Sequence, residues 1–318
     1  MISVAMCTFN GEKYIKEQIE SIINQSLVPD EIVICDDCSK DNTVDIIKET
    51  LANWSGKANL IINEHNLGYR KNFEKAISLC KGDIIFLSDQ DDVWNRYKVE
   101  IMVAALKNSN DVILAFHDVE IVDENLNLIK KSFWKLLKFD YKKFLRNDFR
   151  RIFESNVVQG SACVIKKELF NYARPFPEVA IHDEWLGLVA LAKGKVVPVN
   201  KLLAKYRQSN SNAIGVETIS LLKRVKILMS NRHNQNIKLL NGLVRREEVL
   251  NCFYERFGKD VLTINMECQK YLDFYTFRLN YIENKKALNL MRLNYFKIFD
   301  TKIYALRRML RDIIACIS

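Results

Sequence analysis

Three carboxylates stand within four residues at the end of an apolar run. The run Ile84–Leu87 lacks polar alternation, which predicts a strand buried on both faces, and Asp89, Asp91 and Asp92 follow it. Crowded acids repel one another and lose hydration, a cost that a divalent cation or several hydrogen-bond donors would offset. Oxygen ligands of this kind suit Mg²⁺ or Mn²⁺ completed by water and substrate phosphates. The alternative is a solvated turn that caps the next helix.

The segments around this cluster alternate between strand-like and helix-like patterns. Apolar runs predict strands at 2–7, 31–35, 60–63 and 84–87, and helical periodicity predicts helices at 14–24, 43–51 and 69–80. This alternation is typical of an α/β fold with a mainly parallel sheet and helices on both faces. Because such sheets bind ligands beyond the carboxyl ends of their strands, we expect Thr8–Asn10, Asp36–Ser39 and Asp89–Asp92 to line one crevice.

Composition limits the class of protein. With 318 residues, 48% hydrophobic and 27% charged, the chain is long enough for one large globular domain and a smaller one. No glycine-rich G-x-G-x-x-G or P-loop pattern is present, which argues against a dinucleotide-binding Rossmann domain and a P-loop NTPase. Cys35 and Cys38 form the only close cysteine pair, so a four-thiolate zinc site is not expected.

Four motifs together resemble the family 2 glycosyltransferases, most closely the bacterial rhamnosyltransferase-like members. They are Cys7–Gly11, Asp36–Thr43, Asn66–Asn72 and Asp89–Asp92, and the resemblance covers roughly residues 1–215. It implies a GT-A fold, a nucleoside-diphosphate sugar donor and a divalent cation, Mn²⁺ or Mg²⁺, held by the D-x-D motif. It further implies that Asp91 is a direct metal ligand, that Asp89 contacts the ribose or the metal, and that Asp92 supports the loop.

The donor half is expected to span residues 1–110. An ionised Asp37 would accept the imide N–H of uracil or thymine, as the matching aspartate does in the family. Thr8, Phe9 and Asn10 would line the base and ribose, and Arg70 opens a helix that would face the nucleotide. Local structure offers alternatives, namely an Asx turn at Asp37, helix capping by Thr8 and Asn10, and a solvated helix face for Arg70.

The acceptor half is expected to span residues 111–215. The strand 112–116 is predicted to end at His117, and Gly160 with Ser161 would let an acceptor approach the backbone. The family places its catalytic base at the aspartate that matches Asp183, and Glu184 and Trp185 would contact the acceptor; helix capping is the alternative for Asp183.

A polar segment, residues 206–212, follows a predicted strand at 202–205. Family members often carry a histidine at the position of Ser209, where it helps to hold the metal or diphosphate. This departure leaves the third metal ligand open. The planar guanidinium of Arg207 suits phosphate and is the expected replacement contact; packing at the sheet edge is the alternative.

Residues 216–318 read as a helical extension, with helices predicted at 219–257 and 261–284. The net charge of +9 is concentrated at the end, where residues 285–318 hold eight Lys or Arg against Asp300 and Asp312. An amphipathic stripe over 303–317 would lie on an anionic membrane surface, or pack on the catalytic domain or a second subunit. The basic residues lack an interleaved aromatic platform, so nucleic-acid binding is not expected.

The expected function is metal-dependent, inverting sugar transfer onto a glycan or lipid-linked glycan acceptor in surface-polysaccharide assembly. By resemblance the donor is dTDP-L-rhamnose. The alternatives are a UDP-hexose-dependent transferase and a non-catalytic sugar-nucleotide-binding scaffold on the same fold. Met1 leads directly into the first strand without a basic leader, so the expected location is the cytoplasm, peripheral at the inner face of the plasma membrane.

Overall fold

The structure is a computed structural model that describes residues 1–208, 232–260 and 262–283. The chain separates into two compact units, residues 1–215 and 216–318. The boundary falls where predicted strands give way to predicted helices. Every candidate donor, acceptor and metal residue named above lies in the first unit.

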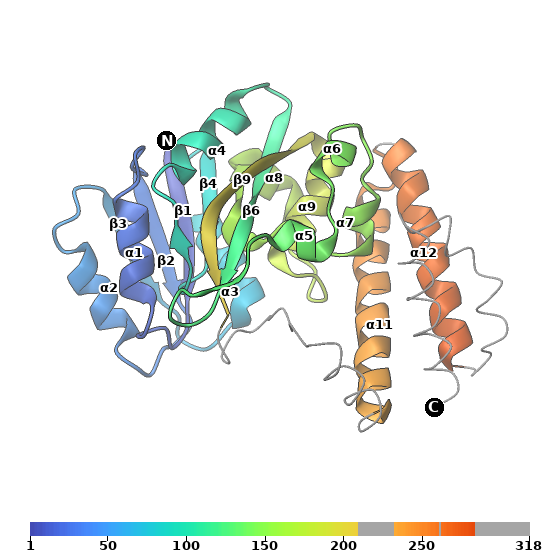
Figure 1. Ribbon diagram of the computed structural model, residues 1–318, viewed down its shortest axis with the longest axis horizontal. Helices are drawn as coiled ribbons and strands as arrows, with labels where there is room; N and C mark the ends of the chain where they lie inside the picture. Colours follow the sequence, from blue (N-terminus) through green and yellow to red (C-terminus); the bar gives the residue numbers. More distant parts are fainter. Residues whose placement is uncertain (209–231, 261, 284–318) are drawn as a thin grey trace. The chain divides into compact units, whose positions relative to one another are not determined.

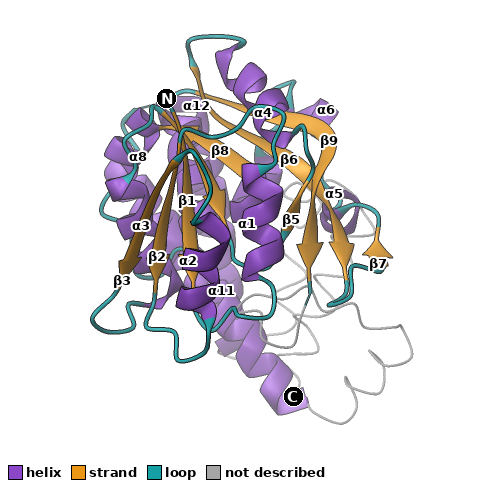
Figure 2. Ribbon diagram, turned by 90° about the vertical axis from the view of Figure 1, so that its left-hand side faces the viewer, coloured by secondary structure: helices purple, strands orange, loops and turns teal. Residues whose placement is uncertain are grey.

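The first unit is built on one sheet, in the order β3-β2-β1-β4-β8-β6-β9-β5 with β7 paired to β6. Its strands are β1 (Ile2–Thr8), β2 (Glu31–Asp36), β3 (Lys57–Ile62), β4 (Ile84–Ser88), β5 (Val93–Trp94), β6 (Val112–Val122), β7 (Leu128–Lys130), β8 (Cys163–Lys166) and β9 (Lys195–Arg207). Neighbouring strands β3, β2, β1 and β4 run parallel, as do β6 and β9, whereas β8 is antiparallel to β4 and β6. Figure 2 shows β3 at one edge of the sheet and β7 at the other side. The expected mainly parallel α/β fold is confirmed.

Helices cover both faces of this sheet (Figure 1). They are α1 (Ile15–Ile23), α2 (Thr43–Leu51), α3 (Gly68–Leu79), α4 (Lys98–Lys107), α5 (Phe133–Leu137), α6 (Tyr141–Phe144), α7 (Arg150–Glu154), α8 (Lys167–Ala173) and α9 (His182–Lys193). Helices α1, α2 and α4 share one apolar core, in which Val4 and Met6 of β1 join Ile19 and Met102. Helix α3 packs on β1 and β2, and α9 contacts both α3 and α8. Burial on both faces explains why the central strands have no polar alternation.

Strand β6 corrects one expectation, because it does not end at His117 but continues to Val122. His117 Nδ1 lies 2.8 Å from the carbonyl oxygen of Asp118, and the Asp118 carboxylate accepts hydrogen bonds from the backbone N–H groups of Val119 (2.9 Å) and Trp134 (3.0 Å). These contacts bind His117 Nδ1 and the Asp118 carboxylate inside the sheet, whereas His117 Nε2 is buried without a hydrogen-bond partner among the described residues. A polar pair in a strand therefore need not mark its end.

The second unit contains α11 (Arg232–Phe257) and α12 (Leu262–Glu283), which pack against each other. Phe253 and Tyr271 are among their buried side chains. Within the described residues, the helices predicted at 219–257 and 261–284 are confirmed. Ser209 and the amphipathic stripe over 303–317 lie outside the described residues. Among the helices that the structure describes, none has the length and apolar character needed to cross a membrane.

Candidate active site

The ends of β1 and β2 lie side by side, because Thr8 is paired with Asp36 in the parallel register. Thr8 Oγ1 donates to Asp36 Oδ2 at 2.7 Å, and Ser39 donates to both oxygens of the same carboxylate, from its backbone N–H (2.9 Å) and its hydroxyl (2.6 Å). Asp36, not Asp37, therefore closes the turn after β2. Asn10 adopts a left-handed conformation with φ of 49° and accepts the backbone N–H of Lys40 at 2.8 Å.

Asp37 is buried beside this turn. Its Oδ1 accepts from Asn63 Nδ2 (2.8 Å) and from the N–H of Leu67 (2.7 Å), and its Oδ2 accepts from the N–H of Gly68 (2.9 Å). The carboxylate thus orders the start of α3. A carboxylate oxygen has two acceptor sites, so Oδ2 retains capacity for one more donor, and base recognition by Asp37 stays a prediction.

The exposed Phe9 lies between the first strand end and the acidic loop 89–92. Its backbone N–H donates to Gln90 Oε1 at 2.7 Å, and Gln90 Nε2 returns a bond to the Phe9 carbonyl at 3.1 Å. A Cβ atom on Gly11 would stand 2.4 Å from Gln90 Oε1, so any larger residue there would displace the Gln90 amide. The Gln90 amide therefore joins the two loops, a role that sequence reasoning missed.

The three carboxylates of the acidic loop are all destabilised as anions. Burial raises the pKa of Asp89 well above its usual range, and the charges of Asp92, Asp91 and Asp183 raise it further. Burial, followed by the charge of Asp92, raises the pKa of Asp91 to about 7. Burial also raises the pKa of Asp92, while the Ser161 hydroxyl and the backbone N–H of Arg207 lower it. Asp183 belongs to the same electrostatic cluster, although it is remote in sequence.

These residues fit a divalent cation. Asp92 Oδ2 is buried and accepts no hydrogen bond of normal geometry from any described residue, although Ser161 lies near enough to lower the pKa. No group of three or more His, Cys, Asp or Glu in the described part of the chain is arranged to enclose a metal ion. Two carboxylates with open positions are what Mg²⁺ or Mn²⁺ uses when substrate phosphates complete its shell. Asp89 and Asp91 are the residues that would hold it.

Arg207 is only 2% exposed and its guanidinium is bound by other parts of the chain, so diphosphate contact by Arg207 stays a prediction. Its Nε donates to the Asp91 carbonyl at 2.8 Å, its Nη2 to Glu17 Oε2 at 2.5 Å and its backbone N–H to Asp92 Oδ1 at 3.1 Å. The side chain also lies over the Tyr14 ring, 4.4 Å from the centroid. Arg207 therefore holds the acidic loop in place through the Asp91 carbonyl and the Asp92 carboxylate.

Asp183 lies in the first turn of α9, whose N-cap residue is Ile181, so Asp183 is not the helix cap. Its Oδ1 accepts from Asn156 Nδ2 at 2.8 Å and from the backbone N–H of Glu184 at 2.7 Å. Burial raises the pKa of Asp183 to about 7, against the lowering effect of these bonds and of the Gly160 backbone N–H. A carboxyl group with this pKa is suited to general-base work near neutral pH.

The predicted acceptor contacts are buried. Trp185 is 0% exposed and donates from Nε1 to the Ala173 carbonyl at 2.7 Å, so it is a core residue. Ser161 and Glu184 are also buried, at 0% and 3% exposure, and acceptor contact by either residue stays a prediction. Glu184 and Trp185 lie in α9, which is enclosed on nearly every side. Gly160 packs tightly, since a Cβ atom there would lie 2.6 Å from His182 Nε2.

Sequence reasoning missed Lys98, the first residue of α4. Its side chain is fully buried, and burial lowers its pKa to about 7 although the charges of Asp92 and Asp89 raise it. The sequence carried no indication of this, because a lysine that opens a helix after a turn is ordinarily solvated. His182 was also missed; burial lowers its pKa to about 3, and its ring stacks on Phe73 with centroids 3.8 Å apart.

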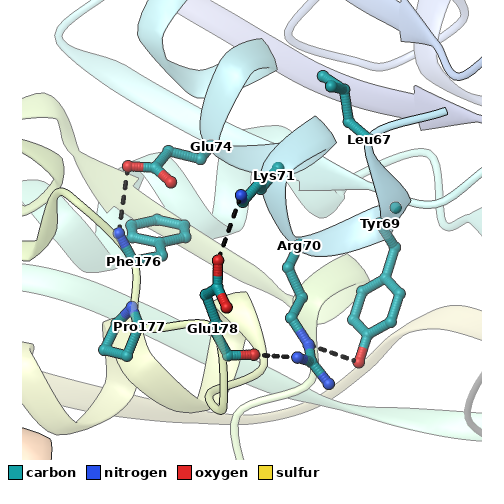
Figure 3. Close-up of a pocket in the computed structure, with 9 residues that line it drawn as sticks. Leu67, Tyr69, Arg70, Lys71, Glu74, Phe176, Pro177 and Glu178 are labelled. Carbon is teal, nitrogen blue, oxygen red and sulfur yellow. Dashed lines mark hydrogen bonds and ion pairs between the residues drawn. The ribbon is translucent and has the colours of Figure 1, made fainter. Parts of the chain in front are cut away.

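A pocket with a volume of about 280 Å³ lies between the start of α3 and residues 176–178 (Figure 3). Arg70 donates to the Glu178 carbonyl, Lys71 pairs with the Glu178 carboxylate at 3.4 Å, and Glu74 accepts the backbone N–H of Phe176 at 3.1 Å. The guanidinium of Arg70 thus lines this pocket together with Tyr69, whose hydroxyl it contacts at 3.1 Å. Donor binding by Arg70 stays a prediction.

The class of protein that this fold and site define is the GT-A glycosyltransferases. The family described as glycosyl transferase family 2 matches residues 3–172, more than half of the chain. The chain therefore belongs to glycosyl transferase family 2, as its motifs predicted.

Relatives by sequence carry transferase names. An uncharacterized glycosyltransferase of Methanocaldococcus jannaschii is 30% identical over 71% of this chain and 76% of its own length. The dTDP-rhamnosyl transferase RfbG of Shigella flexneri is 28% identical over 75% of this chain and 84% of its own length. The Escherichia coli protein WfgD, named as a UDP-Glc:alpha-D-GlcNAc-diphosphoundecaprenol beta-1,3-glucosyltransferase, is 28% identical over 67% of this chain and 79% of its own length. These names support a transferase activity.

Solved structures show the same fold. TarS of S. aureus in complex with UDP-GlcNAc superposes with a TM-score of 0.57 at 17% identity, over 89% of this chain and 91% of that one. The mannosyltransferase PcManGT of Pyrobaculum calidifontis, in complex with GDP-Man and Mn²⁺, gives a TM-score of 0.57 at 14% identity, over 99% of this chain and 86% of that one. The predicted GT-A architecture is confirmed.

The pKa of Asp183 predicts a pH dependence of turnover. A general base works in its ionised form, and the folded protein protonates Asp183 as the pH falls through about 7. We expect kcat to rise with pH and to level off above neutrality. Measurements of kcat at saturating metal, donor and acceptor from about pH 5 to about pH 9 test this. A profile that stays flat through neutrality would contradict the assignment.

Proposed function

We propose that this protein transfers a sugar from a nucleoside-diphosphate donor to a hydroxyl of a glycan acceptor with inversion at the anomeric carbon. One observation carries the proposal: the buried Asp183 shares an electrostatic cluster with Asp89, the first carboxylate of the acidic loop. A base and a cation-binding loop that face each other are what a single displacement requires. The base prepares the attacking oxygen on one side while charge on the leaving group is neutralised on the other.

In this mechanism Asp183 accepts the proton of the acceptor hydroxyl as its oxygen attacks the anomeric carbon. The bond between that carbon and the diphosphate oxygen breaks in the same step, so one displacement gives inversion. Asn156 and the Glu184 backbone N–H orient the carboxylate by their bonds to Oδ1. A divalent ion, when bound by Asp89 and Asp91, supplies Lewis-acid stabilisation of the leaving diphosphate. Asp37 would read the base from the neighbouring strand end.

The first donor that we propose is dTDP-L-rhamnose, for the assembly of a surface polysaccharide. The support is the similarity to RfbG, named as a dTDP-rhamnosyl transferase. A UDP-hexose is the second candidate, because WfgD, a UDP-Glc-dependent enzyme by name, is equally similar at 28% identity. The two nucleotides differ in the 5-methyl group of the base and in the ribose 2′-hydroxyl, so the same strand ends would have to distinguish them.

A donor panel tests the proposal. The purified protein is incubated with Mn²⁺ and dTDP-rhamnose, UDP-glucose, UDP-GlcNAc or GDP-mannose, and the melting temperature is measured for each. A ligand at about 100 times its Kd should stabilise the native state by about 2.7 kcal/mol. The best donor is then tested for transfer, with nucleoside diphosphate release as the readout. If no sugar nucleotide raises the melting temperature, the proposed function is wrong.

We also propose that the protein acts in the cytoplasm, peripherally at the inner face of the plasma membrane, on a lipid-linked acceptor. The support is the diphosphoundecaprenol acceptor in the name of WfgD and the basic segment 285–318. Sedimentation of the full chain with anionic vesicles should decrease when residues 300–318 are removed. An unchanged partition would argue for protein contact by this segment, including contact with a second subunit.

A further inference from the structure

Lys98 is held in an unusual place for a lysine. Its side chain is 0% exposed, and its Nζ lies 3.6 Å from the centroid of the Trp94 ring. The same ammonium donates a hydrogen bond to the backbone carbonyl of Ser161. Withdrawal of an ammonium group from water is costly unless it gains partners, so these contacts must offset a substantial desolvation penalty.

On one side, Lys98 faces the acidic loop. The carboxylates whose charges act on its ammonium are those of Asp92 and Asp89. Asp92 is fully buried, and the Arg207 backbone N–H, at 3.1 Å, donates to its Oδ1. Lys98 therefore supplies a cationic charge to a buried carboxylate whose other contacts are the uncharged Ser161 hydroxyl and the backbone N–H of Arg207.

On the other side, Lys98 faces the short turn η1 (Gly160–Ala162). Its bond to the Ser161 carbonyl fixes the peptide chain directly after Gly160. The Gly160 backbone N–H points at the Asp183 carboxylate, and a Cβ atom on Gly160 would lie 3.4 Å from Asp183 Oδ2. The turn η1 thus contacts Lys98 through Ser161 and the candidate base through the preceding residue, Gly160.

We propose that Lys98 is a positioning residue that ties the acidic loop to the candidate base through the turn η1. By its hydrogen bond to the Ser161 carbonyl, Lys98 fixes the turn η1 and so keeps the Gly160 N–H directed at Asp183. By its positive charge, Lys98 stabilises the ionised form of Asp92, next to the cation-binding Asp91. The consequence for catalysis rests on the proposed transferase function. The structural linkage itself does not.

Simple filling of space does not explain this lysine. An unbranched apolar side chain such as methionine occupies a similar volume without the desolvation cost of an ammonium group. A lysine is needed only if its charge, its hydrogen bond or both are used. The charge and the hydrogen bond of Lys98 can be separated by experiment, because the charge acts on Asp92 whereas the hydrogen bond is made to the Ser161 carbonyl.

The test compares Lys98→Met, Asp92→Asn and the double variant with wild type. Lys107→Met is the matched control, because Lys107 ends the same helix and is exposed. Hydrogen exchange of a peptide covering residues 156–163 reports on the turn η1. We expect Lys98→Met to speed its exchange about tenfold, equivalent to about 1.4 kcal/mol of lost local stability, and Lys107→Met to leave it unchanged. The double variant should have a higher melting temperature than Lys98→Met, because it leaves no buried charge unpaired. The turn η1 should still exchange as fast in the double variant as in Lys98→Met.

Turnover supplies the second readout. A displaced base lowers kcat, and a displacement of about 1 Å costs up to about 100-fold. We expect Lys98→Met to lower kcat about 10- to 100-fold relative to wild type, and the double variant to lower it by a similar factor relative to Asp92→Asn. In both comparisons the donor KM should change less than about twofold. If the double variant matches Asp92→Asn in both exchange and kcat, Lys98 acts only as the counter-ion of Asp92 and the proposal is wrong. If wild type transfers no sugar, the proposed function fails, and the exchange comparison still decides the linkage.

Discussion

Replacement of Asp183 by asparagine is expected to lower kcat by about 10²- to 10⁴-fold, the range that a general base contributes. The substitution keeps the shape of the side chain and its Oδ1 acceptor, so the bonds from Asn156 and Glu184 can persist. It removes only the capacity to take a proton. Donor binding, measured by calorimetry with nucleoside diphosphate and Mn²⁺, should remain within about threefold of wild type, because Asp183 is not assigned to the donor.

Stability gives this variant a second signature. The pKa of Asp183 is raised from 3.8 to about 7 in the folded state. A raised pKa means that the folded protein favours the protonated carboxyl, so this stability is present at low pH and is lost as the pH rises through about 7. Asparagine stays neutral at every pH. Because the loss runs from about pH 4 to about pH 7, Asp183→Asn should be more stable than wild type at about pH 8, by up to about 4 kcal/mol, and similar to it only at about pH 3.

The matched control is Asp111→Asn, which makes the same substitution at an exposed aspartate. It should leave kcat unchanged. The pKa of Asp111 is lowered by its hydrogen bond with Ser109, so its effect on stability is confined to below about pH 4 and does not overlap the window expected for Asp183. Asp183→Asn with wild-type kcat would remove the base from the mechanism. Loss of activity together with a lower melting temperature at about pH 8 would indicate that Asp183 has a structural role.

The parallel part of the fold was predictable because its strands are buried on both faces and its helices carry one apolar stripe. The helix predicted at 43–51 coincides with α2, Thr43–Leu51. Strand β3 begins at Lys57, before the predicted start at residue 60, because its first residues are exposed and do not form an apolar run. An edge strand needs fewer apolar residues than a central one, and apolar periodicity is therefore least informative there.

The sequence predicted which strand ends form the site, but it did not predict which side chains contact one another there. Arg207 donates to Glu17, which is 190 residues away in the chain, and to the Asp91 carbonyl, and these bonds hold its guanidinium beside the acidic loop. Trp185 lies two residues after the candidate base Asp183, yet its ring is buried in the core. Sequence spacing indicates which residues share an element. The identity of a cation's partner depends on long-range packing that local patterns do not record.

Replacement of Asp91 by asparagine is expected to weaken Mn²⁺-dependent donor binding by about 100-fold or more, since loss even of an outer-shell group costs about 10- to 100-fold. The pKa of Asp91 is about 7 in the metal-free protein, and a cation binds the ionised carboxylate. Metal binding should therefore release protons, and wild-type affinity for Mn²⁺ should rise with pH through neutrality. Asp91→Asn should lose the part of this pH dependence that comes from Asp91, whereas the part that comes from the raised pKa of Asp89 should remain.

Calorimetry of nucleoside diphosphate with and without Mn²⁺ separates metal-assisted binding from binding of the nucleotide itself. The base and ribose contacts expected at Thr8, Asn10 and Asp37 lie at other strand ends, so metal-free affinity should be unchanged in Asp91→Asn. Asp92→Asn is the informative comparison, because this variant removes a carboxylate charge that acts on the buried Lys98 ammonium. It should therefore reduce stability more than it reduces the response to Mn²⁺. Equal enhancement by Mn²⁺ in Asp91→Asn and wild type would show that the cation is held elsewhere.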